Sequence, residues 1–360
     1  MKKVLIIITT GFESNGGLAS VMMNYYRHMD RTNYQIDFAS TNIPDERLAV
    51  EVEESGARYF NLGERKSNTL KYICNLIRLL RKERYDIIHV NGNSATMIFE
   101  LLPALLCGVK LRIAHGHTTK SNYPKMHNIL APFFRKTYNK AIAVSKDTGE
   151  WLYHKNYIIL NNAIDVGHYQ YNVSARKKIR KELGLSDQLV IGNVGKLNGP
   201  KNHTFLIDIF MEINKKREDA VLIIAGGGEL EAELKQKCKD LQITDKVYFL
   251  GMLDDVSEVI QAYDVFVFTS IFEGLGMALI EAQACGLECI SSDVVPEETA
   301  VTENIQYMSL NQSAKEWADK VLEVSNYDRM EHSKKAVESV KKHGYDIRYE
   351  ASKLVDLYNS

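Results

Sequence analysis

The chain of 360 residues lacks the features that mark several classes of protein. Its five cysteines have neither metal-binding nor redox spacing, which favours a reducing compartment without disulfides. No apolar run approaches the ~20 residues of a membrane-spanning helix, and the longest candidate, Ile98–Cys107, is interrupted by Glu100 and Pro103. Met1-Lys2-Lys3 leads into only a short apolar run, so no signal peptide is expected. These absences predict a cytoplasmic globular protein.

Three sequence motifs are also missing. The N-terminal glycine loop lacks the G-x-G-x-x-G spacing of a dinucleotide site, so no such cofactor is expected. No Asp-x-Asp follows a predicted strand, and Asp254-Asp255 is expected to cap a helix, so no metal ion is predicted. There is no aromatic-rich basic sheet or recognition helix, which argues against a nucleic-acid partner.

Apolar runs of strand length alternate with helical patterns along the whole chain. This alternation predicts parallel sheets covered by helices on both faces, and the length suits two domains. We therefore predict an α/β protein of two doubly wound, Rossmann-like domains, residues 1–166 and 167–344, followed by a last helix at 345–360. In such sheets a ligand binds at the carboxyl ends of the strands.

The stretch VFVFTSIFEGLGMALIEAQACGLEC, Val265–Cys289, is the most informative part of the chain. A predicted buried strand, Val265–Phe268, is followed by a glycine-containing turn and then by a helical pattern. Such a turn offers backbone N–H groups and a helix dipole to an anion. Glu273 lies in the turn and Glu281 in the predicted helix. Because a carboxylate close to a phosphate is repelled by it, the two glutamates are better suited to the hydroxyls of a sugar and of a ribose on either side of a phosphate.

Two further loops follow predicted strands. VGKLNGPKN carries Lys196 and Lys201, which could neutralise a diphosphate, above all as it leaves. RIAHGHTTK carries His115 and His117. Two histidines without a third ligand are weak evidence for a metal site, and a single histidine is often structural.

The string EGLGMALIE followed by ACG, together with VGKLNGPKN, resembles the retaining glycosyltransferases of family 4, and more specifically those that build capsular polysaccharide or exopolysaccharide. The resemblance implies the GT-B fold, with two domains facing across a cleft and the last helix packed on the N-terminal domain. It implies metal-independent transfer of a sugar from a nucleotide-sugar, which is a substrate rather than a cofactor, to a growing, lipid-linked glycan. Usage in the family favours UDP.

The same resemblance implies roles for individual residues. Glu273 would hold the donor sugar, with His117 on the reacting face, where it hydrogen-bonds a donor hydroxyl. Glu281 would bind the ribose. Lys196 and Lys201 would bind the diphosphate, although Lys196 replaces an arginine and so offers a point charge instead of a bidentate contact. The remaining residues expected at the donor are Gly16, Gly17, Gly195, Leu250, Met252, Gly274, Leu275, Gly276 and Met277.

The acceptor side is less marked. Asn91-Gly92-Asn93 and Glu100 follow a predicted strand and could meet the acceptor. After the predicted strand Cys289–Ser292, the family usually has Gly-Gly, whereas this chain has Asp293-Val294, so contact of that loop with the donor is in doubt.

Basic residues gather in the N-terminal half. Residues 1–165 hold 22 Lys and Arg against 15 Asp and Glu, and the segment 65–140 holds 14 against 3. Within it, Leu70–Arg84 and Tyr123–Lys140 mix apolar with basic residues. They are either core-facing helices with solvated lysines, or a surface for anionic lipid headgroups at the inner face of the plasma membrane.

Two other functions remain open. One is a nucleotide-sugar epimerase on the same fold, which would convert the donor without an acceptor. The other is a non-catalytic partner subunit that holds another transferase. The two glutamates and two lysines of the predicted donor site favour a transferase over the partner subunit.

Overall fold

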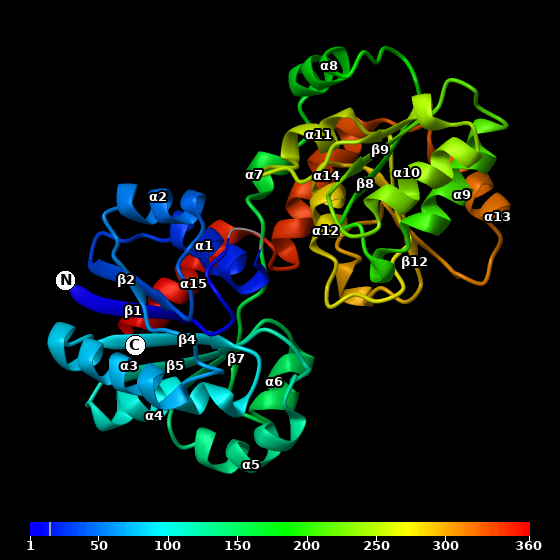
Figure 1. The fold of residues 1–360 in the computed structure, drawn as a ribbon. Coiled ribbons are helices and arrows are strands. Elements are labelled where there is room, and N and C mark those ends of the chain that lie inside the picture. Colours follow the sequence, from blue (N-terminus) through cyan, green and yellow to red (C-terminus); the bar gives the residue numbers. More distant parts are fainter. Residues whose placement is uncertain (14–15) are drawn as a thin grey trace. The chain divides into compact units, whose positions relative to one another are not determined.

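A computed structural model describes residues 1–13 and 16–360 and divides the chain into two compact units (Figure 1). Unit 1 comprises residues 1–163 and 347–360, and unit 2 comprises residues 164–346. The sequence places the corresponding boundaries after residues 166 and 344. Each unit contains one parallel sheet with helices on both faces, which confirms the predicted α/β class with two doubly wound domains.

The sheet of unit 1 has seven parallel strands in the order β3-β2-β1-β4-β5-β6-β7. Successive residues of β1 are buried on opposite faces: Val4 and Ile6 pack into one core cluster, and Leu5 and Ile7 into the other. The strands are β1 (Lys2–Ile8), β2 (Tyr34–Ser40), β3 (Tyr59–Asn61), β4 (Ile87–Gly92), β5 (Leu111–Gly116), β6 (Lys140–Ala143) and β7 (Ile158–Ile159).

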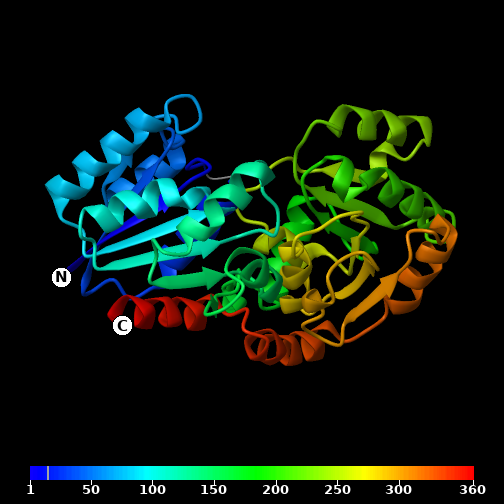
Figure 2. The same ribbon diagram turned by 90° about the horizontal axis from the view of Figure 1, so that it is seen from below.

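Helices cover both faces of this sheet. The first face carries α1 (Gly17–His28), α2 (Glu46–Glu54) and α15 (Ile347–Asn359). The second face carries α3 (Thr69–Glu83), α4 (Ile98–Leu106), α5 (Pro124–Phe134) and α6 (Lys146–Leu152), and a short 3-10 helix, Ala95–Met97, precedes α4. The last helix, α15, which is the red helix at the C-terminus in Figure 2, packs against α1 although most of the chain separates them.

The sheet of unit 2 has six parallel strands in the order β10-β9-β8-β11-β12-β13. The strands are β8 (Val190–Val194), β9 (Val221–Ala225), β10 (Val247–Phe249), β11 (Val265–Phe268), β12 (Glu288–Ser292) and β13 (Ile305–Met308). The edge strand β13 is absent from the sequence prediction, because its short polar-apolar pattern has no strong period.

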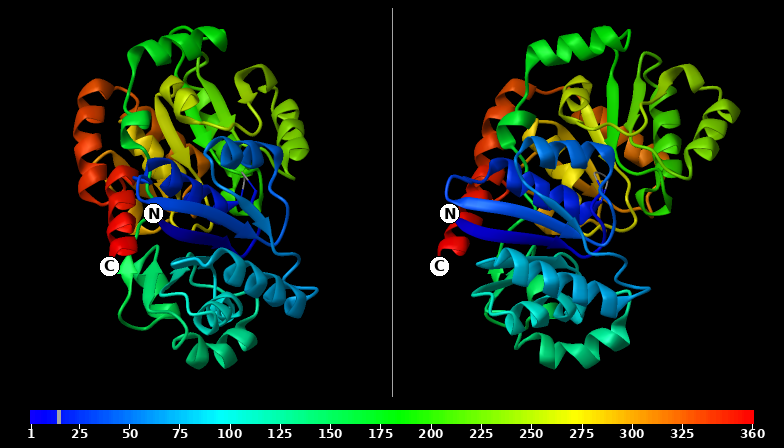
Figure 3. Two further views of the ribbon diagram at one scale, coloured as in Figure 1. Left: turned by 90° about the vertical axis from the view of Figure 1, so that its left-hand side faces the viewer. Right: turned by 60° about the vertical axis from the view of Figure 1, so that its left-hand side comes forward.

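Helices also cover both faces of this second sheet (Figure 3). One face carries α9 (His203–Asn214), α10 (Glu231–Asp240) and α13 (Ala314–Val324). The other carries α8 (Val173–Glu182), α11 (Ser257–Ala262) and α12 (Met277–Ala284), with α7 (Val166–Tyr169) and α14 (Arg329–Lys342) against α12. Short 3-10 helices lie at Gly199–Lys201, Thr244–Lys246 and Glu297–Thr299.

The strand order reverses at one point in each sheet. The reversal lies between β1 and β4 in unit 1, and between β8 and β11 in unit 2. Loops that leave the carboxyl ends of the two strands at such a point diverge, and the space between them is where open α/β sheets bind ligands. In unit 2 these are the loops that carry Lys201 and Glu273.

We predict that Leu354→Ala in α15 lowers the free energy of unfolding of unit 1 by about 2–5 kcal/mol, because a fully buried leucine leaves a cavity. Urea unfolding measures the loss, and hydrogen exchange should place it in residues 1–163 and 347–360. The exposed Asp356→Ala on the same helix should change stability by less than ~0.5 kcal/mol. An equal loss of protection throughout unit 2 would contradict the assignment of α15 to unit 1.

Candidate active site

The loops after β8 and β11 are held together by hydrogen bonds. The backbone N–H of Ile271 donates to the carbonyl of Pro200 at 2.8 Å. The hydroxyl of Thr269 donates to the carbonyls of Lys201 and Asn202 at 3.3 and 3.1 Å. Because the two strands are neighbours, these bonds bring Lys201 to the turn that carries Glu273.

Lys201 and Glu273 form an ion pair, with 2.5 Å between Nζ and Oε1. The hydroxyl of Ser270 donates to the same Oε1 at 2.6 Å, and Nζ lies 5.1 Å from the centre of the Phe268 ring. The side chains are 22% and 9% exposed, so each charge depends on the other in the ligand-free protein. A diphosphate at Lys201 would compete with Glu273 and release its carboxylate for hydroxyl groups.

The turn after Glu273 leaves the N-terminus of α12 open. Gly276 is the N-cap residue with φ of 83°, a left-handed conformation that favours glycine, and no side chain caps the helix. The first N–H groups of α12, which begins at Met277, therefore have no capping side chain among the residues that the structure describes. Gly274 is exposed, and Leu275 and Met277 are half-buried. These predicted donor residues thus lie where a phosphate could meet a helix N-terminus.

A glycine turn after β9 supports the loop of Gly195. A side chain on Gly226 would meet the carbonyl oxygen of Gly195 at 2.0 Å, and one on Gly228 would meet that of Leu197 at 2.3 Å. The N–H of Gly195 also donates to Ala225 at 3.0 Å. The turn therefore has a structural reason for its glycines. In the supported loop, Lys196 is exposed and forms no ion pair within the described residues.

The two predicted base contacts differ in access. The N–H of Leu250 is bonded to the carbonyl of Ile224 at 3.0 Å within the sheet, whereas Met252 is 65% exposed. Their roles remain predictions.

Glu281 lies on α12, partly buried beside Tyr169 of α7. Burial raises the pKa of Glu281 to about 7, while a hydrogen bond from Tyr169 lowers it and the charge of Asp255 raises it. Near neutral pH this carboxyl group therefore populates both its protonated and its charged form. It can donate a hydrogen bond to a ribose hydroxyl in the first form and accept one from it in the second.

In unit 1, His117 follows β5 and its Nε2 lies 3.0 Å from Oδ1 of Asn91. Its ring packs 4.1 Å from the ring of His115, and burial lowers the pKa of His117 to about 3, so the ring is neutral. His115 is 1% exposed, which makes His117 the more accessible of the two predicted histidines. Gly17 is the first residue of α1 and Gly16 its N-cap. Ser14 and Asn15 of that loop lie outside the described residues.

The interpretation of Glu100 as an acceptor contact is wrong. Glu100 lies on α4 with no exposed surface, and its Oε1 is 2.8 Å from Nε of Arg65. The helix turns this carboxylate into the core, where the guanidinium group compensates its charge.

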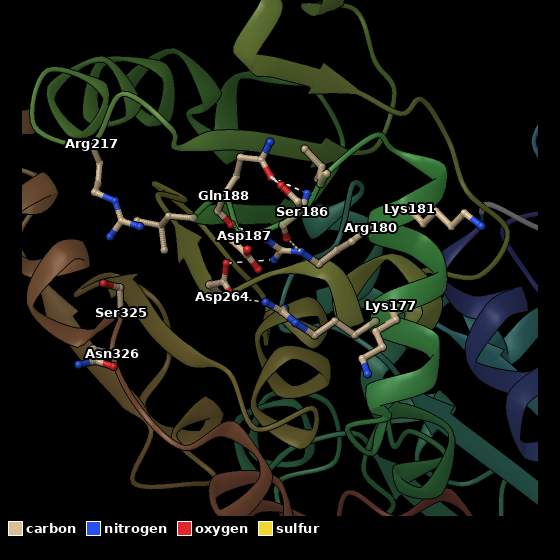
Figure 4. A pocket seen from close by; sticks show the side chains of 13 residues that line it. Lys177, Arg180, Lys181, Ser186, Asp187, Gln188, Arg217, Asp264, Ser325 and Asn326 are labelled. Carbon is tan, nitrogen blue, oxygen red and sulfur yellow. Dashed lines mark hydrogen bonds and ion pairs between the residues drawn. The ribbon is translucent and has the colours of Figure 1, made fainter.

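The structure also contains a basic cavity of about 680 Å³ in unit 2 (Figure 4). It lies at the amino ends of the strands, away from the loops described above. Arg176 and Arg180 both bind Asp264, at 2.5 and 3.3 Å, and Arg180 also donates to the carbonyl of Ser186. The charges of these two arginines are therefore partly compensated within the protein.

Two residues that hydrogen-bond the predicted site glutamates were not identified from the sequence: Ser270 and Tyr169. Ser270 stands directly after β11, and its position at a strand end was the signal that could have revealed it. Tyr169 lies in a segment expected to be a linker, and only the packing of α7 on α12 brings it to Glu281. In the part of the chain that is described, no three His, Cys, Asp or Glu residues are arranged to hold a metal ion. Metal independence remains a prediction.

Solved structures share this fold over the full chain. A protein from Anabaena, Alr3699/HepE, crystallised with UDP, superimposes with a TM-score of 0.79 and 16% identity, covering 100% of both chains. At this identity the likeness shows the fold alone. It places the chain among proteins with two Rossmann-like domains, the GT-B class.

Curated proteins are similar in sequence as well. The putative glycosyltransferase EpsF of Bacillus subtilis is 27% identical, covering 99% of this chain and 96% of its own length. A UDP-Gal:alpha-D-GlcNAc-diphosphoundecaprenol alpha-1,3-galactosyltransferase of Escherichia coli is 30% identical, covering 62% of each chain.

Two family models match consecutive parts of the sequence. The model for Glycosyltransferase Family 4 matches residues 15–167, and that for Glycosyl transferases group 1 matches residues 175–343. The chain belongs to glycosyltransferase family 4, which confirms the resemblance inferred from its motifs.

We predict that Glu281→Gln removes a pH-dependent loss of stability. The folded protein keeps a proton on Glu281 up to about pH 7, whereas the unfolded chain releases it near 4.5, so this residue's contribution falls as pH rises through that interval. At about pH 8 the variant should be more stable than the wild type by about 1–2 kcal/mol, discounted for partial exposure, and equal at about pH 4. Urea unfolding against pH measures this, with the exposed Glu233→Gln as control. A constant difference at every pH would disprove the shifted pKa.

Proposed function

We propose that the protein is a retaining glycosyltransferase that moves a sugar from a UDP-sugar to a growing, lipid-linked glycan in surface polysaccharide synthesis. The observation that carries the proposal is the Lys201–Glu273 pair beside the uncapped N-terminus of α12, with Glu281 on the same helix. Two of the similar proteins support the donor and acceptor classes: one was crystallised with UDP, and the other is named for a UDP-Gal donor and a diphosphoundecaprenol acceptor.

Each group then has a definite task. The diphosphate lies between Lys201 and the first N–H groups of α12, which neutralise the charge that grows as it leaves and take the place of a metal ion. Glu273, released from Lys201, accepts hydrogen bonds from the donor sugar, and Glu281 binds the ribose. His117 contacts a donor hydroxyl.

No side-chain nucleophile is assigned in this mechanism. The bond from the sugar carbon to the UDP oxygen breaks, and the acceptor oxygen forms its bond on the same face of the sugar. The proton of the acceptor hydroxyl passes to the departing phosphate oxygen, so the leaving group acts as the base.

We predict that UDP raises the melting temperature more than GDP, ADP or CMP. A ligand at a hundredfold excess over its Kd adds ~2.7 kcal/mol to the free energy of unfolding, so the nucleotide that binds most tightly should give the largest shift. Lys201→Ala should weaken UDP binding by about 30-fold or more and slow transfer, because it removes the half-buried cation and leaves Glu273 without its ion-pair partner. Glu281→Ala should also lose the UDP shift. The exposed Lys239→Ala is the matched control and should behave as wild type.

The same assays separate the alternatives. Product formed from the nucleotide-sugar without any acceptor would favour an epimerase. Absence of a shift with every nucleotide, in a folded wild type, would favour the non-catalytic partner. Unchanged transfer in Lys201→Ala would contradict the proposed mechanism.

The structure distinguishes the two basic segments. On α3, Tyr72, Leu76 and Leu80 are buried, as in a core-facing helix. On α5, Met126, Ile129 and Phe133 are 43%, 69% and 62% exposed, at the spacing of one helix face. Residues 101–146 hold eight Lys and Arg and no Asp or Glu. No helix among the described residues is both long and apolar enough to span a bilayer.

We propose that this α5 face contacts anionic lipid headgroups at the inner face of the plasma membrane, where a lipid-linked acceptor would be found. Apolar side chains enter the interface, and each basic residue near the surface adds ~1 kcal/mol.

We predict that the double variant Ile129→Glu/Phe133→Glu lowers binding to vesicles containing phosphatidylglycerol by about tenfold or more, because it places carboxylates in the interface. Co-sedimentation measures this, with phosphatidylcholine vesicles as the neutral reference. Leu70→Glu on α3, where Leu70 is 79% exposed, is the control and should bind as wild type. Equal binding by the wild type and the double variant would exclude this surface.

A further inference from the structure

The orientation of the Asn91 side chain is determined by its neighbours. Asn91 is the penultimate residue of β4 and has no exposed surface. Its Nδ2 donates to the carbonyls of Ile7 and His89, both at 3.4 Å. If the side-chain amide of Asn91 were flipped, its Oδ1 would lie against these two carbonyl oxygens, and acceptors repel each other. The amide therefore points Nδ2 at the carbonyls and Oδ1 at His117.

This orientation determines the proton position on His117. Its Nε2 lies 3.0 Å from Oδ1 of Asn91, and an amide oxygen only accepts, so Nε2 carries the proton. Burial holds the pKa of His117 at about 3, so the ring has a single proton and its Nδ1 has none. Within the described residues, no hydrogen bond to Nδ1 is formed.

A histidine stack holds the ring from its other side. The hydroxyl of Tyr358 in α15 lies 2.8 Å from Nδ1 of His89, and Nε2 of His89 lies 3.2 Å from Nδ1 of His115. The ring of His115 then packs on His117. The groups facing His117 are therefore neutral imidazoles and an amide, with His89 and His115 also kept uncharged because burial lowers their pKa.

Unit 2 contains the same arrangement. Asn193, penultimate in β8, donates from Nδ2 to the carbonyl of Val267 at 2.8 Å, and its Oδ1 lies 2.9 Å from Nε2 of His203. His203 is 1% exposed, and its Nδ1 has no partner among the residues that the structure describes. Both asparagines belong to a strand at the point where the strand order reverses. An amide that fixes a histidine tautomer is thus present in each sheet.

We propose that Asn91 is a positioning residue that locks His117 as the neutral Nε2–H tautomer, so that Nδ1 accepts a hydrogen bond from a hydroxyl of the donor sugar. His117 then orients the substrate and donates no proton to it. The place of His117 at the donor rests on the proposed function, whereas the lock itself is a property of unit 1.

The test is NMR of the full chain labelled with ¹⁵N-histidine, with His117→Gln used to assign the signal. Wild-type His117 should remain the neutral Nε2–H form from about pH 5 to about pH 8. In Asn91→Asp, the carboxylate stabilises the imidazolium, so His117 should begin to titrate in this interval. Asn193→Asp is the matched control: it should shift His203 and leave His117 unchanged.

Activity provides the second readout. Asn91→Asp should lower kcat by about tenfold or more, with a new dependence on pH, and leave the UDP melting shift unchanged. A purely structural role would not move the pH profile. A wild-type His117 with its proton on Nδ1, or an Asn91→Asp variant whose His117 does not respond, would overturn the proposal even if transfer is observed. A confirmed tautomer in a protein without transferase activity would instead contradict the proposed function.

Discussion

The pairing of Lys201 with Glu273 is the interaction on which the candidate site depends. It exists because β8 and β11 are neighbours in the sheet, although 70 residues lie between the end of β8 and the start of β11. Three hydrogen bonds then join the loops that follow the two strands. A lysine and a glutamate so close and so poorly exposed stabilise each other only while no anion is present. An anionic ligand at Lys201 would therefore change the partner of both residues at once. In the proposed function, this exchange would couple recognition of the phosphate to release of the carboxylate.

The sequence predicts local features well and long-range contacts poorly. Glu273, Gly276 and Glu281 lie in one strand–turn–helix segment, so their relation could be predicted from one stretch of chain. The family motif added Lys201. The bond between Tyr169 and Glu281 joins residues far apart in sequence, and so does the bond between Asn91 and His117. Neither has a periodic signal, because the partners meet only after the helices pack on the sheet.

Burial, which the sequence does not state, decides which charged residues are available. Glu100 and its partner Arg65 lie in the core of unit 1, and Tyr72, Leu76 and Leu80 of α3 point into it, so these parts of the basic half are structural. Met126, Ile129 and Phe133 of α5 do the opposite and are exposed, in a segment of the chain rich in basic residues. The charge distribution thus indicated an anionic partner. Only the fold distinguishes a basic helix whose apolar face packs into the core from one whose apolar face is free to contact a membrane surface.

The two units use different electrostatics, and the difference matches what each would bind. In unit 2 the site contains Lys201, Glu273 and Glu281, whose charges suit a diphosphate and the hydroxyls beside it. In unit 1 the carboxyl end of β4 carries the neutral amide of Asn91, and that of β5 carries His115 and His117, whose imidazoles burial keeps uncharged. Neutral acceptors can orient a sugar hydroxyl without attracting a counterion or repelling the leaving diphosphate. Asn91→Asp would remove this neutrality with almost no change in side-chain shape. Its carboxylate would favour the protonated form of His117 and introduce a charge at a position where the present side chain is neutral.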